Sequence, residues 1–135
     1  METRIRNSFA RQTMMQTLGA RLERVSAGEA VISAPLLPGS RQQHGAAHAA
    51  LTFAIGDSAA GYAALSVLPE DSEVMTAEMK INLLAPGLGE ELQATGKVIK
   101  PGRRLVVVTA EVHALQDGEE KLVALLQGTM VPVTP

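Results

Sequence analysis

The longest feature in the hydrophobic pattern is an apolar run that begins near His48 and ends near Leu68. Alanine is the commonest residue in this run and also the best helix former, and no proline occurs before Pro69. The pattern therefore predicts one long helix over residues 48–68. A helix that is apolar on nearly all sides must be buried on nearly all sides, so we expect other elements to surround it.

Alternating apolar and polar residues predict strands on both sides of this helix. A hairpin precedes it, with strands near 20–26 and 29–36, and a weaker helical pattern over residues 4–17 has Ile5 and Phe9 one turn apart on one face. The four strands predicted after Pro69 cover residues 74–84, 92–100, 105–115 and 122–133. Short turns join them, so we expect antiparallel neighbours.

Two of these strands have a clear apolar face. The face predicted for residues 74–84 consists of Met75, Ala77, Met79, Ile81 and Leu83. The face predicted for residues 105–115 consists of Val106, Val108, Ala110, Val112 and Ala114. Taken together, the elements predict an α+β fold with one core: a six-stranded antiparallel sheet wrapped around one long central helix, with a short N-terminal helix, in a single domain over residues 1–135.

Composition removes several classes of function. The chain has 135 residues and a formal charge of −2, from 12 basic and 14 acidic residues, which argues against a nucleic-acid surface. It has no cysteine, which excludes disulfides, thiolate metal sites and a cysteine nucleophile. The first ten residues lack the apolar core of a signal peptide, and the polar residues of the long apolar run argue against a membrane span. We therefore expect a soluble cytoplasmic protein.

Asp57 is the one acid in the long apolar helix, where an unpaired carboxylate is unfavourable. It is therefore either a structural group that is hydrogen-bonded within an interface or a functional one. His48 precedes it by nine residues, which places the two on opposite faces of the helix and about 13–14 Å apart along the axis. They cannot meet in one site within one chain. If both act in the chemistry, the sequence predicts a homo-oligomer with shared sites.

The order of elements, the segment QQHGAAHAALTFAIGDSAAGYAA and the later EMKINLLAPG resemble the hotdog-fold acyl-CoA thioesterases. The most similar branch is the phenylacetate-pathway (PaaI-like) group. In that family a His-Gly-Gly segment starts the central helix, and a catalytic Asp or Glu follows the His by nine residues. His48 and Asp57 have this spacing, whereas Ala49 and Ala50 stand where the two glycines are expected.

The resemblance implies roles for particular residues. Asp57 would be the nucleophile or the general base, two roles between which the family does not decide. The amide of Ala49 would polarise the thioester carbonyl, which a main-chain N–H can do whatever the side chain. Gln42, with Gln43 as the adjacent candidate, would orient substrate or water, and Thr76 would lie near the reacting centre. The family also implies an acyl-CoA substrate and a homodimer or dimer of dimers with each site across an interface.

Other residues are candidates for binding the substrate. Gly61 lies one turn after Asp57 and leaves room either for a substrate chain or for close packing of the helix. The turn with Arg103 and Arg104, together with Lys80, could bind the phosphates of coenzyme A or could simply face solvent. His44 is a loop histidine that could contact the substrate. Three histidines without clustered acids do not predict a metal site, and thioester hydrolysis requires no cofactor.

Two other functions are compatible with the same pattern. One is a hotdog hydratase or dehydratase, and the other is a non-catalytic protein that binds acyl ligands. The position of the acid nine residues along the helix favours hydrolysis, and the chain has no room for the DNA-binding segment that acyl-ligand sensors usually carry. Aromatic residues number only three, Phe9, Phe53 and Tyr62, which slightly favours an aliphatic acyl group.

Overall fold

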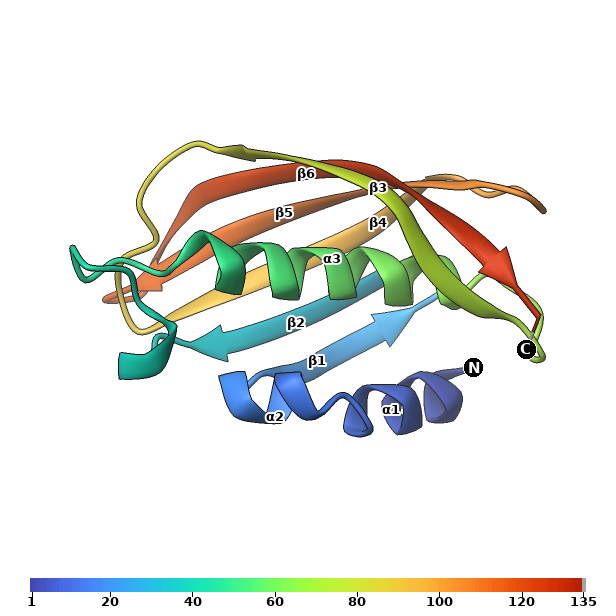
Figure 1. Ribbon diagram of the computed structural model, residues 1–135, viewed down its shortest axis with the longest axis horizontal. Helices are drawn as coiled ribbons and strands as arrows, with labels where there is room; N and C mark the ends of the chain where they lie inside the picture. The colour runs from blue at the N-terminus through green and yellow to red at the C-terminus, as the bar shows by residue number, and fades with distance from the viewer. Residues whose placement is uncertain (135) are drawn as a thin grey trace.

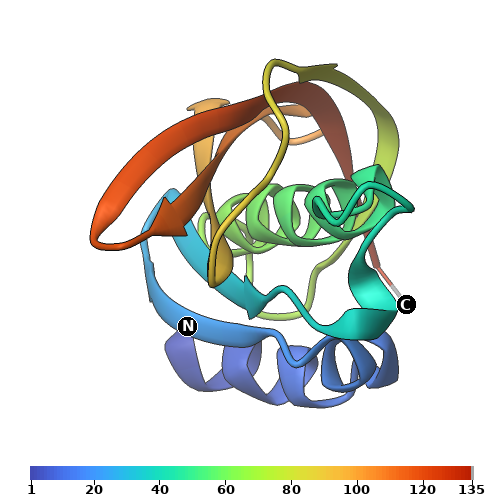
Figure 2. The same cartoon turned by 90° about the vertical axis from the view of Figure 1, so that its left-hand side faces the viewer.

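One antiparallel sheet of six strands curves around a single long helix, as the computed structural model of residues 1–134 shows (Figures 1 and 2). The helices are α1 (Glu2–Ala10), α2 (Thr13–Leu18) and α3 (Ala49–Leu65), with a 3₁₀ turn η1 (Pro38–Ser40). The strands are β1 (Arg21–Ser26), β2 (Glu29–Pro35), β3 (Glu73–Leu83), β4 (Glu91–Lys100), β5 (Val106–Gln116) and β6 (Glu119–Val133). Their order in the sheet is β1-β2-β4-β5-β6-β3, which confirms the predicted hotdog architecture.

The central helix α3 lies in the concave side of the sheet, as the view along its axis shows (Figure 2). His48 is its N-cap residue, and the ring nitrogen Nδ1 accepts a hydrogen bond of 2.8 Å from the amide of Ala50. The helix ends at Leu65, three residues before its predicted end, where Ser66 is the C-cap. Among the described residues, no helix is long and apolar enough to cross a membrane.

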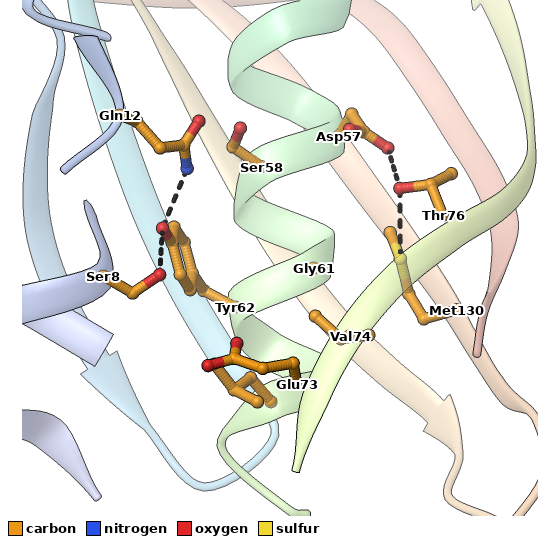
Figure 3. Close-up of a pocket in the computed structure, with 11 residues that line it drawn as sticks. Ser8, Gln12, Asp57, Ser58, Gly61, Tyr62, Glu73, Val74, Thr76 and Met130 are labelled. Carbon is orange, nitrogen blue, oxygen red and sulfur yellow. Dashed lines mark hydrogen bonds between the residues drawn. The ribbon is translucent and has the colours of Figure 1, made fainter. Parts of the chain in front are cut away.

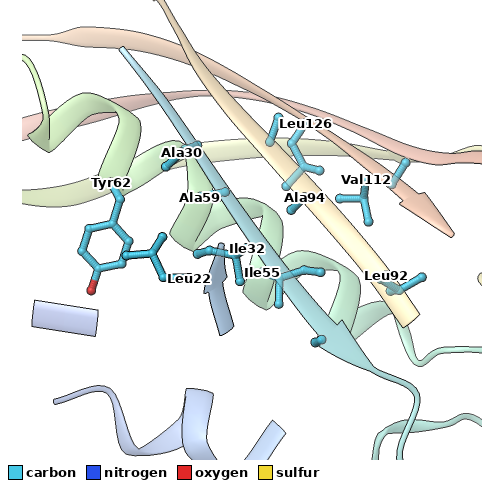
Figure 4. Close-up of a cluster of buried hydrophobic side chains, with 14 of the residues drawn as sticks. Leu22, Ala30, Ile32, Ile55, Ala59, Tyr62, Leu92, Ala94, Val112 and Leu126 are labelled. Atoms are coloured by element: carbon cyan, nitrogen blue, oxygen red, sulfur yellow. The ribbon is translucent and has the colours of Figure 1, made fainter. Parts of the chain in front are cut away.

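The core lies between α3 and the sheet (Figure 4). All five residues of the apolar face predicted for β5 are buried, as predicted: Val106, Val108, Ala110, Val112 and Ala114. On β4, a side chain at Gly96 would collide with the main chain of Ala59 in α3. The helix backbone therefore lies directly against the sheet, and only a glycine permits this approach.

The apolar face predicted for β3 is confirmed at Met79 and Ile81, which pack against the core, but Leu83 is 58% exposed and the prediction for the first half of the strand is wrong. The pairing of β3 with β6 shifts between Thr76 and Glu78, so Ala77 is an extra residue in a β-bulge. The bulge reverses the alternation: Val74 packs towards the core, whereas Met75 is 63% exposed. Thr76, which simple alternation places on the outer face, is thereby directed towards α3.

The N-terminal segment forms two helices instead of the one predicted over residues 4–17. The backbone is extended at Gln12, which separates α1 from α2. The fully buried Ile5 anchors α1 to the core, and the guanidinium of Arg4 donates to the carbonyls of Leu65 (2.8 Å) and Pro69 (2.7 Å) at the end of α3. Figure 2 shows both helices beneath β1, on the side of α3 that the sheet leaves open.

Candidate active site

A cavity of about 230 Å³ opens beside the second half of α3. It is bounded by α1, the α1–α2 connection, α3, β3 and β6, and Asp57 lines one side of it (Figure 3). The lone acid of the central helix therefore does not lie in the core, and it faces a space that a small molecule can enter. Asp57 forms no ion pair with any of residues 1–134.

Asp57 is held by a neighbour from another element. The Thr76 hydroxyl donates a hydrogen bond of 2.8 Å to Asp57 Oδ1 and also lies 3.3 Å from the sulfur of Met130 on β6 (Figure 3). Burial raises the pKa of the Asp57 carboxyl above its ordinary value, and the hydrogen bond from Thr76 partly opposes that shift. A raised pKa brings the carboxylate closer to what a general base needs near neutral pH.

Gly61 lies one turn along α3 from Asp57 and also lines the cavity (Figure 3). A Cβ placed there would meet only the methyl group of Met130, at an ordinary 3.8 Å. At Gly56, by contrast, a Cβ would lie 2.9 Å from a methyl of Leu126. Close packing therefore accounts for Gly56. At Gly61, the missing side chain leaves open space inside the cavity.

The side of the cavity away from Asp57 is polar, and the sequence analysis did not predict it. The Tyr62 hydroxyl accepts a 2.8 Å hydrogen bond from the Gln12 amide and lies 3.0 Å from Ser8 Oγ (Figure 3). Tyr62, the one tyrosine of the chain and part of an alanine-rich helix, was a signal that a buried hydroxyl needs a partner. Ser8 and Gln12 gave no such signal, because they are about fifty residues away in sequence.

The start of α3 lines a second cavity, of about 540 Å³. The predicted site residues that border it are Gln42, His48 and Ala49, and Thr52, Leu83 and Leu84 add to its wall. Asp57, Gly61 and Thr76 border the first cavity and not this one. Within one protomer, the predicted catalytic residues other than Gln43 thus fall into two groups that line separate cavities.

The main chain at the start of α3 has one free donor. The amide of Ala50 is bonded to the His48 ring, whereas the amide of Ala49 has no hydrogen-bond partner among residues 1–134. Because Nδ1 of His48 accepts this bond, the neutral ring carries its proton on Nε2. The Ala49 amide adds to the positive end of the helix dipole, a place that favours a developing negative charge.

The loop before α3 is a tight turn that orients Gln42. Its side-chain oxygen accepts a hydrogen bond from the main-chain amide of His44, which leaves its NH₂ group free to donate, and the residue borders the second cavity. Gln43 and His44 are exposed in this loop and line neither cavity. The structure thus groups Gln42 with His48 and Ala49, and it leaves Gln43 and His44 apart from both groups.

The predicted basic residues lie elsewhere on the molecule. Lys80 is on the outer face of the sheet, next to Glu78 and Gln127. Arg103 and Arg104 are exposed in the turn between β4 and β5, and Arg103 borders a third cavity with Val67 and Pro132. None of the three lines the cavity of Asp57 or that of Ala49. The described residues contain no cluster of three His, Cys, Asp or Glu side chains that could hold a metal ion.

This chain is 36% identical over 87 residues to a curated protein of Saccharolobus solfataricus. The name of that protein places it provisionally among the esterases. That match covers 64% of this chain and 55% of the relative, so the chain spans about half the length of this curated protein.

Solved structures share the whole fold. A thioesterase family protein from Silicibacter pomeroyi superposes with a TM-score of 0.97 and is 40% identical, with 99% of this chain and 98% of that chain covered. The PaaI protein of E. coli, from the phenylacetic acid degradation operon, superposes with a TM-score of 0.86. The two are 22% identical, with 97% and 91% of the respective chains covered, a likeness that concerns the fold alone.

The model of the Thioesterase superfamily matches residues 44–121, a span that includes the whole of α3, the bulged strand β3 and the carboxylate of Asp57 with its partner Thr76. More than half of the chain lies within this match, so the protein with the two cavities along its central helix belongs to the Thioesterase superfamily.

Proposed function

We propose that this chain is an acyl-CoA thioesterase that hydrolyses its substrate to a free acid and coenzyme A. The observation that carries the proposal is the half-buried Asp57, which faces a cavity, forms a hydrogen bond with Thr76 and has a raised pKa. Family membership supports a hydrolase. Thioester hydrolysis needs an attacking or water-activating group and a site for the developing oxyanion, and both kinds of group occur along α3.

Asp57 can begin the reaction in two ways. As a general base it takes a proton from water, and the hydroxide adds to the thioester carbonyl carbon. As a nucleophile it adds to that carbon itself and forms an anhydride that water then hydrolyses. In either case the carbonyl oxygen becomes negative, the carbon–sulfur bond breaks, and the thiolate of coenzyme A leaves and takes up a proton. The ionised carboxylate is the active form in both.

The oxyanion would be bound at the start of α3. The Ala49 amide is free to donate, and the NH₂ group of Gln42 is oriented by the bond between its oxygen and the His44 amide. Removing one such donor from an oxyanion site typically reduces the rate by about 10²–10³-fold. His48 would position this donor, because its ring holds the first turn of the helix.

Each complete site would combine two chains. Asp57 and Ala49 line separate cavities in one protomer, and they are eight residues apart on one helix, about 12 Å along its axis. A homodimer, or a dimer of dimers, would bring the start of α3 of one protomer to the Asp57 cavity of its partner. The binding of coenzyme A phosphates by Lys80, Arg103 and Arg104 stays a prediction, because these residues lie apart from both cavities.

The test is to measure the release of free thiol from a panel of acyl-CoA thioesters. We expect the protein to hydrolyse at least one short acyl-CoA. The oxygen ester of the same acyl chain should be hydrolysed much more slowly. Formation of a hydroxyacyl-CoA or an enoyl-CoA without release of free thiol would indicate a hydratase or dehydratase instead. Saturable binding of acyl-CoA without any product would indicate a protein that only binds acyl ligands.

A further inference from the structure

The polar cluster of Ser8, Gln12 and Tyr62 has no part in the chemistry described above, yet it forms one side of the Asp57 cavity. Tyr62 is only 6% exposed, and its hydroxyl is bonded to groups from α1 and from the α1–α2 connection. Ser8 and Gln12 also lie outside the residues that the family model matches. This wall of the cavity therefore joins Tyr62, which lies within the matched residues, to two side chains from outside them.

The cluster has a hydrogen-bond donor to spare. Ser8 and Tyr62 together carry two hydroxyl protons, and the single bond between them uses one. The Gln12 amide donates to the Tyr62 oxygen and so consumes neither proton. No other described residue accepts a hydrogen bond from either hydroxyl. One O–H in this mostly buried cluster is thus free to donate to a ligand, as is the second N–H of Gln12.

The cluster stands at the far side of the cavity from the reacting end. Tyr62 is five residues after Asp57, about 7–8 Å along the axis and roughly 140° around the helix. Gly61 and Ser58 lie between them around the helix, and both line the cavity (Figure 3). Gly61 has no side chain and Ser58 a short one, so space is left beside the helix between Asp57 and the cluster. A chain of a few methylene groups bound over Gly61 would contact Val74, Leu65 and Met130, and it would end at the cluster.

The size and charge of the cavity limit what the far end of the ligand can be. A volume of about 230 Å³ is below the roughly 300–1,000 Å³ that is usual for small-molecule sites, which favours a short chain. The carboxylates of Asp57 and Glu73 both line the cavity and would repel a second carboxylate. An uncharged oxygen that accepts a hydrogen bond is compatible with all of these groups.

We propose that Ser8, Gln12 and Tyr62 recognise the far end of the acyl group, and that the preferred substrates are thioesters of short acyl chains that end in an uncharged hydrogen-bond acceptor, such as a ketone oxygen. This inference rests on the proposed thioesterase function. It makes Gln12 and Tyr62 determinants of specificity, because they would bind the substrate at a distance from the bond that breaks.

The experiment compares pairs of acyl-CoA substrates of equal shape. In each pair a ketone oxygen is replaced by a methyl branch: 4-oxopentanoyl with 4-methylpentanoyl, 5-oxohexanoyl with 5-methylhexanoyl, and 6-oxoheptanoyl with 6-methylheptanoyl. The readout is the ratio of kcat/KM within a pair, which a general loss of stability does not change. One net hydrogen bond to an uncharged group corresponds to about three- to tenfold, so we expect the ketone to be preferred by that factor in at least one pair.

Two variants test the residues themselves. Tyr62→Phe removes only the hydroxyl and keeps the ring that contacts Phe9 edge-on, and Gln12→Leu removes the amide at similar size. Each should bring the ratio close to one. Gln16→Leu is the matched control, because Gln16 is exposed on α2, bonds to the Ala10 carbonyl and does not line the cavity. It should keep the wild-type ratio.

The outcomes separate this inference from the proposed function. If wild-type protein cleaves both members of every pair equally, or prefers the methyl-branched ones, the inference is wrong while the thioesterase function stands. The same holds if the ketone preference survives in both Tyr62→Phe and Gln12→Leu. If none of the thioesters is cleaved, the proposed function is overturned and this inference with it.

Discussion

The two cavities along α3 are built in different ways. Side chains from α1, α3, β3 and β6 form the Asp57 cavity, and its central group is a carboxylate whose pKa is raised by burial. The cavity at the start of α3 presents a main-chain amide, that of Ala49, in a turn held by His48 and Gln42. The chemistry of the Asp57 cavity therefore depends on the identity of a side chain, and that of the cavity at the start of α3 on the conformation of the backbone. Different kinds of substitution are needed to disable the two.

Asp57→Asn is expected to have the largest effect, because it removes the carboxylate that either attacks the thioester carbon or activates water. A loss of about 10²–10⁴-fold in kcat is typical for a general base. The fold should not suffer: since burial raises the pKa of Asp57, the ionised group weakens the folded state at neutral pH. The melting temperature should therefore be equal or higher. A variant that retained a third of wild-type kcat would exclude Asp57 from the reaction.

Ala49→Pro is the corresponding change at the other cavity. It removes the free N–H at the first position of α3, where proline is well tolerated, and His48 before it already has the extended backbone that a residue preceding proline prefers. We expect kcat to fall by about 10²–10³-fold, with little change in the melting temperature. Circular dichroism at matched concentration checks the fold. Wild-type turnover in a folded Ala49→Pro protein would mean that this amide binds no oxyanion.

Mixing these two variants tests whether the cavities belong to one site. If Asp57→Asn and Ala49→Pro chains are refolded together in equal amounts, about half of the dimers are mixed, and each mixed dimer has one doubly damaged and one intact site. Activity should return to about a quarter of wild type. If both groups served one site within one chain, every site would keep a lesion. The absence of recovery, with mixed dimers confirmed by native mass spectrometry, would refute the shared site.

Much of the fold could be predicted because its signals are local. The alternation in β5 and the alanine-rich run of α3 each determine an element over ten or more residues. The bulge at Ala77 could not be predicted, because it depends on how β3 pairs with β6, and so the alternation misplaced Met75 and Thr76. The break at Gln12 was missed for a similar reason: the sequence there has no proline or glycine, and the Gln12 side chain bonds to Tyr62, fifty residues away.

The candidate site was predictable to the same degree. Asp57 stood out because a lone acid in an apolar helix is unfavourable without a reason, and this reasoning needs no knowledge of the surroundings. The polar wall of the cavity, with Ser8 and Gln12, arises only from tertiary packing of α1 against α3. A candidate residue that stands out within one element can thus be picked from sequence, whereas a cluster that needs two distant elements cannot.

Gly61→Ala tests the Asp57 cavity without touching its charge. The added methyl meets only Met130 at ordinary distance, and alanine stabilises a helix interior by up to about 1 kcal/mol relative to glycine. The melting temperature should therefore rise. The kcat/KM for the largest acyl group that wild type accepts should fall by about tenfold, which is the lower end of the discrimination that one extra methylene group gives in a pocket. Gly56→Ala is the control. It should lower the melting temperature, because the added methyl would lie too close to Leu126, and it should leave the ranking of substrates by kcat/KM unchanged.

Thr76→Val should have the smallest effect at neutral pH, and a clear one on the pH profile. The Thr76 hydroxyl favours the ionised form of Asp57, so its removal raises the pKa of Asp57 further above the ordinary value. Because the ionised carboxylate is the active form, activity falls as the pH drops through this pKa, and the acid limb of the kcat/KM profile should move to higher pH. Thr129→Val is the matched control, since Thr129 donates a 2.7 Å hydrogen bond to Glu78 and does not line the Asp57 cavity. An acid limb that stays in place in Thr76→Val, or that moves equally in Thr129→Val, would show that Thr76 does not tune Asp57.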